Sequence, residues 1–357
     1  MSGFKAGFRQ RSPLVLCVAL ALLVPALLGI QWFFTSGAWS AVPMQCWIRD
    51  STDQFIAVSW QVARLKQDPP ELPMVALLAG SGGLEGIVGG PSLAAEVRDD
   101  GGPEIVAYNL SSRKQRFAQS WAIVDNLPNT STTVLIGVSL GRFTTSPASN
   151  YDQVIGRELL LKSDSLRRNV VRTSGEHRYS YTILPGIFSA FATYLQRHER
   201  DLLLHGRLRV RPYREHPMAR RKALSFAEKQ ALVDKWLTQY QPAFDKRLDF
   251  NLAMLERLVR RARARGLGVV IVELPLNYEV IGDRVRELMG RYMRPTQAIA
   301  ERYDVPYLDF NARVDIPSEN FVDLSHLMSA GREVWEAELA RELARLYDEG
   351  VLPVEQP

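Results

Sequence analysis

Residues 74–83 read MVALLAGSGG, an apolar run that passes directly into a turn of small residues. An uninterrupted apolar run of this length predicts a strand buried on both faces, as in a parallel sheet covered by helices. Gly80, Gly82 and Gly83 surround Ser81 and predict a tight turn, after which a helix is expected. A strand, a turn and a helix in this order are typical of an α/β fold.

The same alternation continues along the chain. Further buried strands are expected at 104–110, 133–138, 269–274 and 305–310. Three stretches have apolar residues at helical spacing, which predicts amphipathic helices. They contain Phe117, Trp121 and Val124; residues 246–265; and, near the C-terminus, Trp335, Leu339 and Leu343. These elements predict a three-layer α/β sandwich around a central parallel sheet, with ligands bound at the carboxyl ends of the strands.

The N-terminal region contains a long uncharged segment. Residues 13–34 read PLVLCVALALLVPALLGIQWFF, which is long enough to cross a bilayer as a helix. Lys5, Arg9 and Arg11 precede it, and the next basic residue is Arg49. The positive-inside rule therefore predicts a cytoplasmic tail at 1–12, a transmembrane anchor at 13–35 and an extracytoplasmic, periplasmic remainder. A signal peptide cleaved near residues 38–40 is the alternative.

The remainder divides into three predicted parts. Residues 36–70 are expected to connect the anchor to a catalytic domain formed by 71–150 and 246–350, and 151–245 to form a mostly helical insertion. The chain carries a net charge of +5, and a basic cluster lies in the insertion at Arg207, Arg209, Arg211, Arg214, Arg220 and Arg221. An anionic lipid surface or envelope polymer is a more plausible partner than nucleic acid outside the cytoplasm, although a solvated basic face has the same composition. Cys17 and Cys46 form no disulfide framework or CxxC motif.

Three residues have the chemistry of a nucleophile and its base. Residues 323–326 read DLSH, so Asp323 and His326 are close enough in sequence to face one pocket. Asp323 would orient His326 and stabilise its cationic form, and His326 would deprotonate Ser81. The sequence therefore predicts a serine acyl-transfer site with Ser81 as nucleophile, His326 as base and Asp323 as orienting residue.

Other kinds of site fit the sequence less well. The turn at Ser81 lacks the Gly-Lys-Ser/Thr of a Walker motif, and Glu85 replaces the last glycine of a GxGxxG fingerprint. No further clustered ligand completes a metal site with Asp323 and His326, so neither a metal nor a cofactor is expected. A glycosidase carboxylate pair stays open, with candidates at Glu273, Asp309, Asp315 and Asp323.

The motifs together resemble the SGNH (GDSL-like) hydrolase superfamily. The Gly-Ser turn after the first strand and the late DLSHL at 323–327 are similar to its first and last blocks, and VLIGVSLGRF at 134–143 to its third. ELPLNY at 273–278 resembles the strand ending in Pro-x-Asn of DltD-like proteins, which are membrane-anchored O-acyltransferases of the cell envelope. Gly80 stands where the superfamily usually has the Asp of a Gly-Asp-Ser block.

This resemblance implies an SGNH/flavodoxin-like sheet and a ping-pong reaction through an acyl-Ser81 intermediate. It further implies a membrane-bound O-acyltransferase partner and an acceptor that is an envelope polymer or polysaccharide. Gly82, Ser112, Ser139 and Asn277 are the candidates for oxyanion or substrate binding. An esterase or thioesterase with the same triad is one alternative, and a non-catalytic scaffold of a membrane complex is the other.

Overall fold

The computed structural model describes residues 13–48, 50–152, 160–174, 184–206, 212–218, 222–311 and 313–354. Much of the predicted basic cluster, including Arg207 and Arg221, lies outside these residues, whereas Arg214 lies within them.

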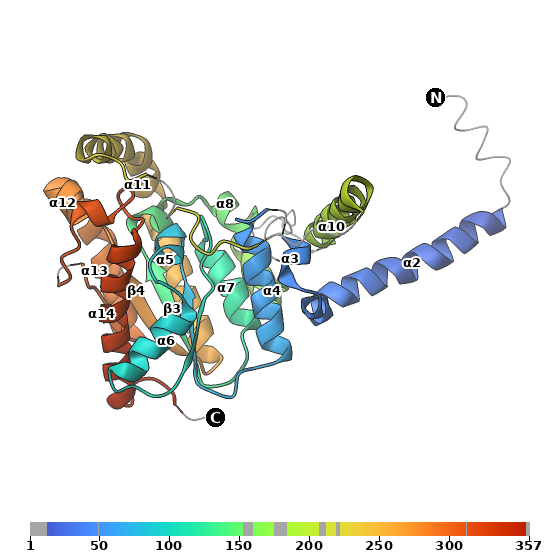
Figure 1. Ribbon diagram of the computed structural model, residues 1–357, viewed down its shortest axis with the longest axis horizontal. Helices are drawn as coiled ribbons and strands as arrows, with labels where there is room; N and C mark the ends of the chain where they lie inside the picture. Colours follow the sequence, from blue (N-terminus) through green and yellow to red (C-terminus); the bar gives the residue numbers. More distant parts are fainter. Residues whose placement is uncertain are drawn as a thin grey trace.

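A five-stranded, all-parallel sheet forms the centre of the protein, in the order β2-β1-β3-β4-β5 (Figure 1). Its strands are β1 (Met74–Leu78), β2 (Val106–Asn109), β3 (Thr132–Val138), β4 (Gly268–Glu273) and β5 (Tyr307–Leu308). This is the doubly wound order, in which the chain runs from β1 toward one edge and then from β3 toward the other. The switch point between β1 and β3 is where such sheets bind their ligands.

Helices cover both faces of the sheet. One face packs against α6 (Gly90–Asp99) and α14 (Ser329–Asp348), and the other against α7 (Phe117–Asn126), α11 (Phe226–Ala264) and α13 (Arg286–Arg302). The predicted parallel sheet between two helical layers is therefore present. Every residue of β1, β3 and β4 is buried, which explains why these strands are continuously apolar in sequence.

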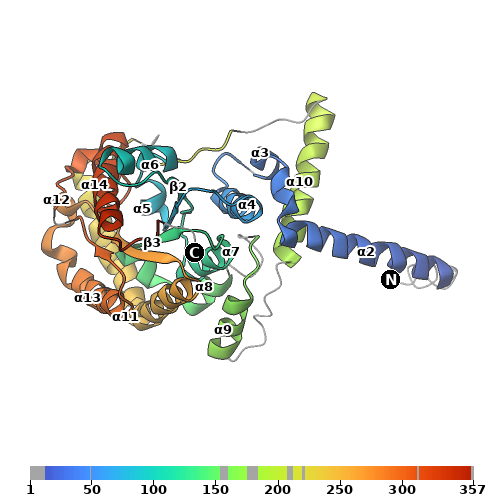
Figure 2. The same cartoon turned by 90° about the horizontal axis from the view of Figure 1, so that it is seen from below.

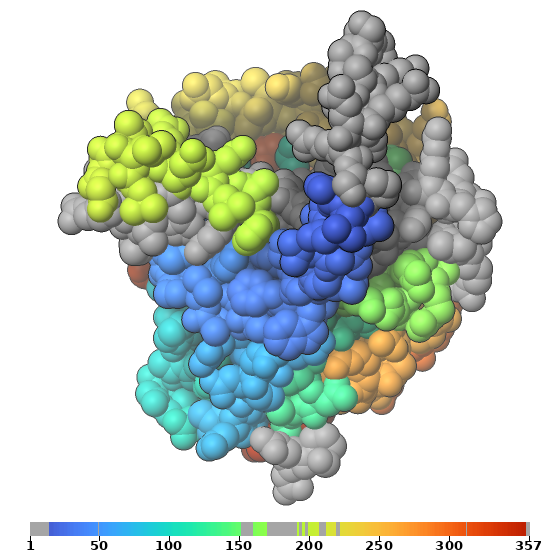
Figure 3. Space-filling view, turned by 90° about the vertical axis from the view of Figure 1, so that its right-hand side faces the viewer, coloured from blue at the N-terminus to red at the C-terminus, as the bar shows by residue number. Residues whose placement is uncertain are grey.

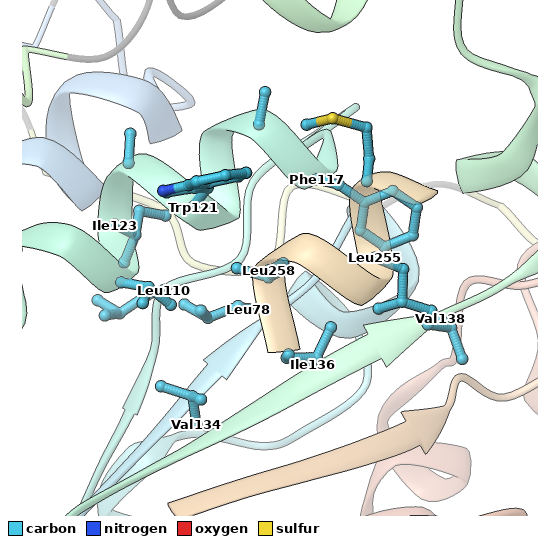
Figure 4. Close-up of a cluster of buried hydrophobic side chains, with 14 of the residues drawn as sticks. Leu78, Leu110, Phe117, Trp121, Ile123, Val134, Ile136, Val138, Leu255 and Leu258 are labelled. Carbon is cyan, nitrogen blue, oxygen red and sulfur yellow. The ribbon is translucent and has the colours of Figure 1, made fainter. Parts of the chain in front are cut away.

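The larger core lies between the sheet and α7 and α11 (Figure 4). Leu78 and Ile136 project from β1 and β3 toward Phe117 on α7 and Leu255 on α11, and all four side chains are at least 98% buried. Burying each such side chain contributes about 1.5–3 kcal/mol to folding. On the opposite face α6 approaches β2 closely, because a Cβ on Gly90 would lie 2.0 Å from the Ala107 carbonyl oxygen.

The N-terminal helix α2 (Pro13–Ser36) extends away from the α/β domain (Figure 1). It is the one helix among the described residues that is long and apolar enough to span a membrane. The predicted connector is partly helical, with η1 (Ala38–Ala41), α3 (Met44–Trp47) and α4 (Gln54–Gln67). Trp39 and Trp47 are buried with Phe34 in an aromatic cluster, which fixes the end of α2 to the domain.

The segment predicted as an insertion is mostly helical where it is described, although 160–163, 212–218 and 222–225 are not helical. It contains the last two residues of α8 (Pro147–Asp152), all of α9 (Asp164–Ser174) and α10 (Leu184–His205), and the first part of α11. Helix α10 lies across the end of α2 that joins the domain (Figure 2). Both helices are on the face of the molecule that Figure 3 shows. Helix α11 continues without a break through 245–246, so the predicted domain boundary falls inside one helix.

Candidate active site

The turn after β1 presents Ser81 at the carboxyl edge of the sheet. Gly80 precedes the single-turn helix α5 (Ser81–Leu84), so the helix predicted after Ser81 exists but ends after four residues. Ser81 is half-buried, whereas Gly82 and Gly83 are buried. A Cβ on Gly83 would lie 2.3 Å from the Cβ of Ala79, so only glycine fits this position without a shift of the turn.

Asp323 and His326 form a hydrogen-bonded pair. His326 Nδ1 lies 2.8 Å from Asp323 Oδ1 and 2.7 Å from Oδ2. The backbone N–H groups of Ser325 and His326 also donate to Oδ1, at 3.0 and 3.1 Å. Burial raises the pKa of Asp323, but the hydrogen bonds and charge of His326 together with the two N–H groups outweigh it, so the pKa falls below its usual value.

The pairing leaves the other ring nitrogen of His326 available. Nε2 is buried and has no hydrogen-bond partner in the part of the chain that the structure describes. Because Asp323 binds Nδ1, it favours the tautomer in which Nδ1 carries the proton and Nε2 is a free base. This is the state that a general base needs before it accepts a proton.

The loop that carries this pair is held from two sides. Asn277 Nδ2 donates to Ser318 Oγ at 3.0 Å and to the Asp323 carbonyl oxygen at 3.3 Å. Lys229, a buried residue near the start of α11, donates through Nζ to the Ser318 carbonyl oxygen. The segment after β4 therefore positions the Asp323–His326 loop directly, and the long helix α11 does so through Ser318.

One pocket brings the Ser81 turn and this loop together. It has a volume of about 260 Å³ and is lined by Ser81, Gly82, Leu324 and Ser325, among others. A Cβ on Gly82 would lie only 3.5 Å from the Ser325 carbonyl oxygen, so the two segments are in contact. No hydrogen bond joins Ser81 Oγ to His326 Nε2 among the described residues, and proton transfer requires these two atoms to approach.

The predicted oxyanion residues lie in different places. Gly82 and Ser139 line the pocket, one after β1 and the other after β3. Ser112 is fully buried, and its Oγ lacks a partner among the described residues, but it is not part of the pocket lining that those residues form. Asn277 is also buried outside that lining, and its amide braces the Asp323 loop and α12 (Tyr278–Ile281).

Several residues of the site were not predicted from the sequence. Lys114, Arg116 and Arg142 line the pocket, and so does Trp236 of α11. The only sequence signal for Arg142 was its position four residues after a buried strand. Trp236 lies within the segment predicted as an insertion, so nothing in its local sequence connected it to the site.

A buried carboxyl group, Glu85, lies behind the site. Its Oε1 accepts the Met218 N–H at 2.8 Å, and its Oε2 lies 3.8 Å from His216 Nδ1. Burial raises the pKa of Glu85, while Met218, His216, Arg332 and His326 act in the opposite direction. The segment 212–218 is thereby fixed against the residue that follows the Ser81 helix.

No family model matches this chain, and no curated protein matches it. The chemistry of the site therefore has to be inferred from its geometry. A half-buried serine, a tight glycine turn and a carboxylate-oriented histidine are the groups that nucleophilic acyl transfer requires.

Proposed function

We propose that this protein is a membrane-anchored serine O-acyltransferase of the SGNH type. The observation that carries the proposal is the Asp323–His326 pair, which leaves a buried Nε2 without a partner among the described residues. His326 itself is outside the pocket lining that these residues form, but Leu324 and Ser325 of the same loop line the pocket together with Ser81. In this proposal α2 is a single-pass anchor with a cytoplasmic N-terminus, and the α/β domain is periplasmic. The acceptor is a cell-envelope polymer or polysaccharide, and a membrane-bound O-acyltransferase supplies the acyl group.

The first half of the reaction forms an acyl-serine. Ser81 Oγ attacks the acyl carbonyl carbon of the donor while its proton passes to His326 Nε2. Asp323 stabilises the imidazolium, and the backbone N–H of Gly82 with the Ser139 hydroxyl provides donors for the oxyanion. When the tetrahedral intermediate collapses, the bond to the leaving group breaks and the leaving group takes the proton from Nε2.

The second half transfers the acyl group to the acceptor. An acceptor hydroxyl gives its proton to Nε2 and attacks the acyl-Ser81 carbonyl carbon, and collapse returns the proton to Ser81 Oγ. Water in place of the acceptor would give an esterase or thioesterase with the same residues. The glycosidase pair has no support here, because among the described residues no two carboxyl groups line the pocket: Glu273, Asp309, Asp315 and Asp323 are all outside its lining.

The test is labelling of the detergent-solubilised full chain with a fluorophosphonate probe, with the adduct located by mass spectrometry. We expect an adduct on Ser81 that disappears in Ser81→Ala and in His326→Ala. Ser149→Ala, which removes an exposed hydroxyl from α8, is the matched control and should label like the wild type. A folded wild type that does not label would leave the scaffold function as the better description, and an adduct on Ser325 would show that Ser81 is not the nucleophile.

A further inference from the structure

The pocket lining combines cationic and apolar side chains. Lys114, Arg116 and Arg142 come from the loops after β2 and β3, and no carboxylate side chain lines the pocket in the part of the chain that is described. The apolar lining comes from α11, the end of β4, α12 and the turn after it: Val233, Trp236, Leu274, Leu276, Ile281 and Val285. Ser81 is part of the same pocket lining.

Arg142 is the strongest indication that a ligand binds near the cationic residues. Its side chain is only 4% exposed, and its guanidinium lies 4.2 Å from the centre of the Phe117 ring. It donates to the carbonyl oxygens of Leu78 and Gly137 and, at 2.8 Å, to Ser120 Oγ, so its hydrogen-bond partners among the described residues are all neutral. The Nε–H group has no partner among the described residues.

A buried cation of this kind is normally paired with an anion. Desolvation, with a smaller contribution from the charge of Arg116, lowers the pKa of Arg142 to about 9. Within the described chain no carboxylate pairs with Arg142, although buried charges in proteins are usually compensated. An anion bound in the adjoining pocket would supply the missing negative charge.

The loop before α7 carries two more cations, Lys114 and Arg116, and its conformation is fixed by a buried hydrogen bond. Gln115 is buried and donates to the Leu110 carbonyl oxygen at 2.8 Å, which fixes the loop before α7. Lys114 has φ 59°, a left-handed conformation that is uncommon for a residue with a Cβ. The N-terminus of α7 begins immediately after Arg116 and adds its partial positive charge.

We propose that the substrate of the Ser81 site carries a phosphate or carboxylate group, which binds among Lys114, Arg116 and Arg142 while its acyl group contacts the apolar residues of the same pocket. This inference rests on the proposed acyl transfer and names the chemical class of its substrate. Arginine binds both anions through two hydrogen bonds, so the residues themselves do not distinguish a phosphoester from a uronic or other carboxylic acid.

The experiment measures how small anions slow fluorophosphonate labelling of the detergent-solubilised full chain. The probes are glycerol 3-phosphate, glycerate and neutral glycerol. We expect at least one anion to protect Ser81 competitively and glycerol to have no effect. Stronger protection by glycerol 3-phosphate would assign a phosphate substrate, and stronger protection by glycerate a carboxylate substrate.

Variants test whether the named cations are responsible. The double variant Lys114→Gln/Arg116→Gln should raise the inhibition constant of the protecting anion at least tenfold. This increase should exceed any change in the labelling rate that the variant shows without the anion. Arg113→Gln removes the same charge from the exposed neighbouring position outside the pocket lining, and it should leave the protection unchanged. The single variant Lys114→Arg, which keeps the positive charge and leaves Arg116 unchanged, should retain the protection of Ser81 by the anion.

The outcomes separate the inference from the proposed function. Normal labelling with no protection by either anion, or protection that survives the double variant, would overturn the inference and support the function. Absence of labelling would overturn the function, and calorimetric titration of glycerol 3-phosphate and glycerate would then decide the inference independently. Binding weakened tenfold by the double variant would support it, and absence of binding to the folded chain would overturn it.

Discussion

Two carboxyl groups, the half-buried Asp323 and the fully buried Glu273, have opposite surroundings. Asp323 accepts hydrogen bonds from an imidazole and from two backbone N–H groups of its own loop. Glu273, at the end of β4, accepts from the hydroxyl groups of Tyr292 and Tyr307, each at 2.8 Å, and these are its hydrogen-bond donors among the described residues. Burial raises the pKa of Asp323 less than its donors lower it, whereas burial raises the pKa of Glu273 to about 8.

The difference teaches that burial alone does not determine the charge of a carboxyl group. A partner that can become a cation, together with donors fixed in the loop, keeps Asp323 ionised. Two neutral hydroxyl donors are too weak to do this for Glu273, which is protonated at neutral pH. In the proposed reaction the ionised Asp323 would stabilise an imidazolium, whereas Glu273 is packed in the protein interior.

The largest effect is expected when the charge of Asp323 is removed. Asp323→Asn should reduce the rate of Ser81 labelling by about 10³–10⁴-fold, because an amide no longer stabilises the imidazolium and favours the wrong tautomer. The measurement is the second-order rate constant for fluorophosphonate labelling. Asp315→Asn changes an exposed carboxylate nearby and should label normally.

The pH dependence of stability offers a second check on Asp323. Its pKa is lower in the folded than in the unfolded protein, so it stabilises the fold above about pH 4 and loses that contribution as the pH falls further. In Asp323→Asn the free energy of unfolding should therefore depend less steeply on pH in that acidic range. A wild-type labelling rate in this variant would show that the pair is structural.

The next largest effect is expected at Glu273. Its folded pKa of about 8 exceeds the unfolded value of 4.5, so the folded protein binds more protons and stability falls as the pH rises from 4.5 to 8. At roughly 1.4 kcal/mol per unit of pKa shift, the loss amounts to a few kcal/mol. Glu273→Gln imitates the protonated acid and should remove this decline, as measured by the melting temperature at pH 5 and pH 8.

Labelling provides the control for this variant. Glu273→Gln should react with the fluorophosphonate probe like the wild type, because Glu273 is not part of the pocket lining that the described residues form. A melting temperature at pH 8 that is no higher in the variant than in the wild type would show that Glu273 is already ionised in the folded protein.

The sheet could be predicted because its strands are buried on both faces and are therefore continuously apolar. β1, β3 and β4 were located to within one residue in this way. The predicted strand at 305–310 is longer than β5, which pairs only with β4 and for two residues. Helix α5 is short because Gly82 and Gly83 have low helix propensity, a cost that the predicted helix did not include.

The site could be predicted only where its chemistry is local in sequence. Asp323 and His326 are three residues apart, so the hydrogen bond between them is local in sequence. Val233 and Trp236 reach the pocket from the first half of α11, where the interior Pro242 resembles a helix boundary. The charge of the pocket depends on loops after different strands, and their proximity follows from the strand order.

A smaller effect is expected at the link between the two regions. Asn277 follows β4 and donates to Ser318 and Asp323, so it connects the end of the strand to the Asp323 loop. Asn277→Ala should cost about 1–3 kcal/mol of stability, because buried acceptors lose their donor. It should also slow Ser81 labelling, because His326 is held less firmly. Loss of stability with unchanged labelling would show that Lys229 alone positions the loop.

The smallest effect is expected when Glu273 loses one of its two donors. Tyr307→Phe removes a hydrogen bond that lowers the pKa of Glu273, so that pKa should rise above about 8 and the decline of stability should extend to higher pH. The loss in stability at pH 5 should be about 1 kcal/mol, the net value of one hydrogen bond. Tyr303→Phe is the matched control, since its hydroxyl donates to Glu256, whose side chain is 30% exposed. Equal pH profiles in the two variants would mean that Tyr292 and burial alone determine the protonation of Glu273.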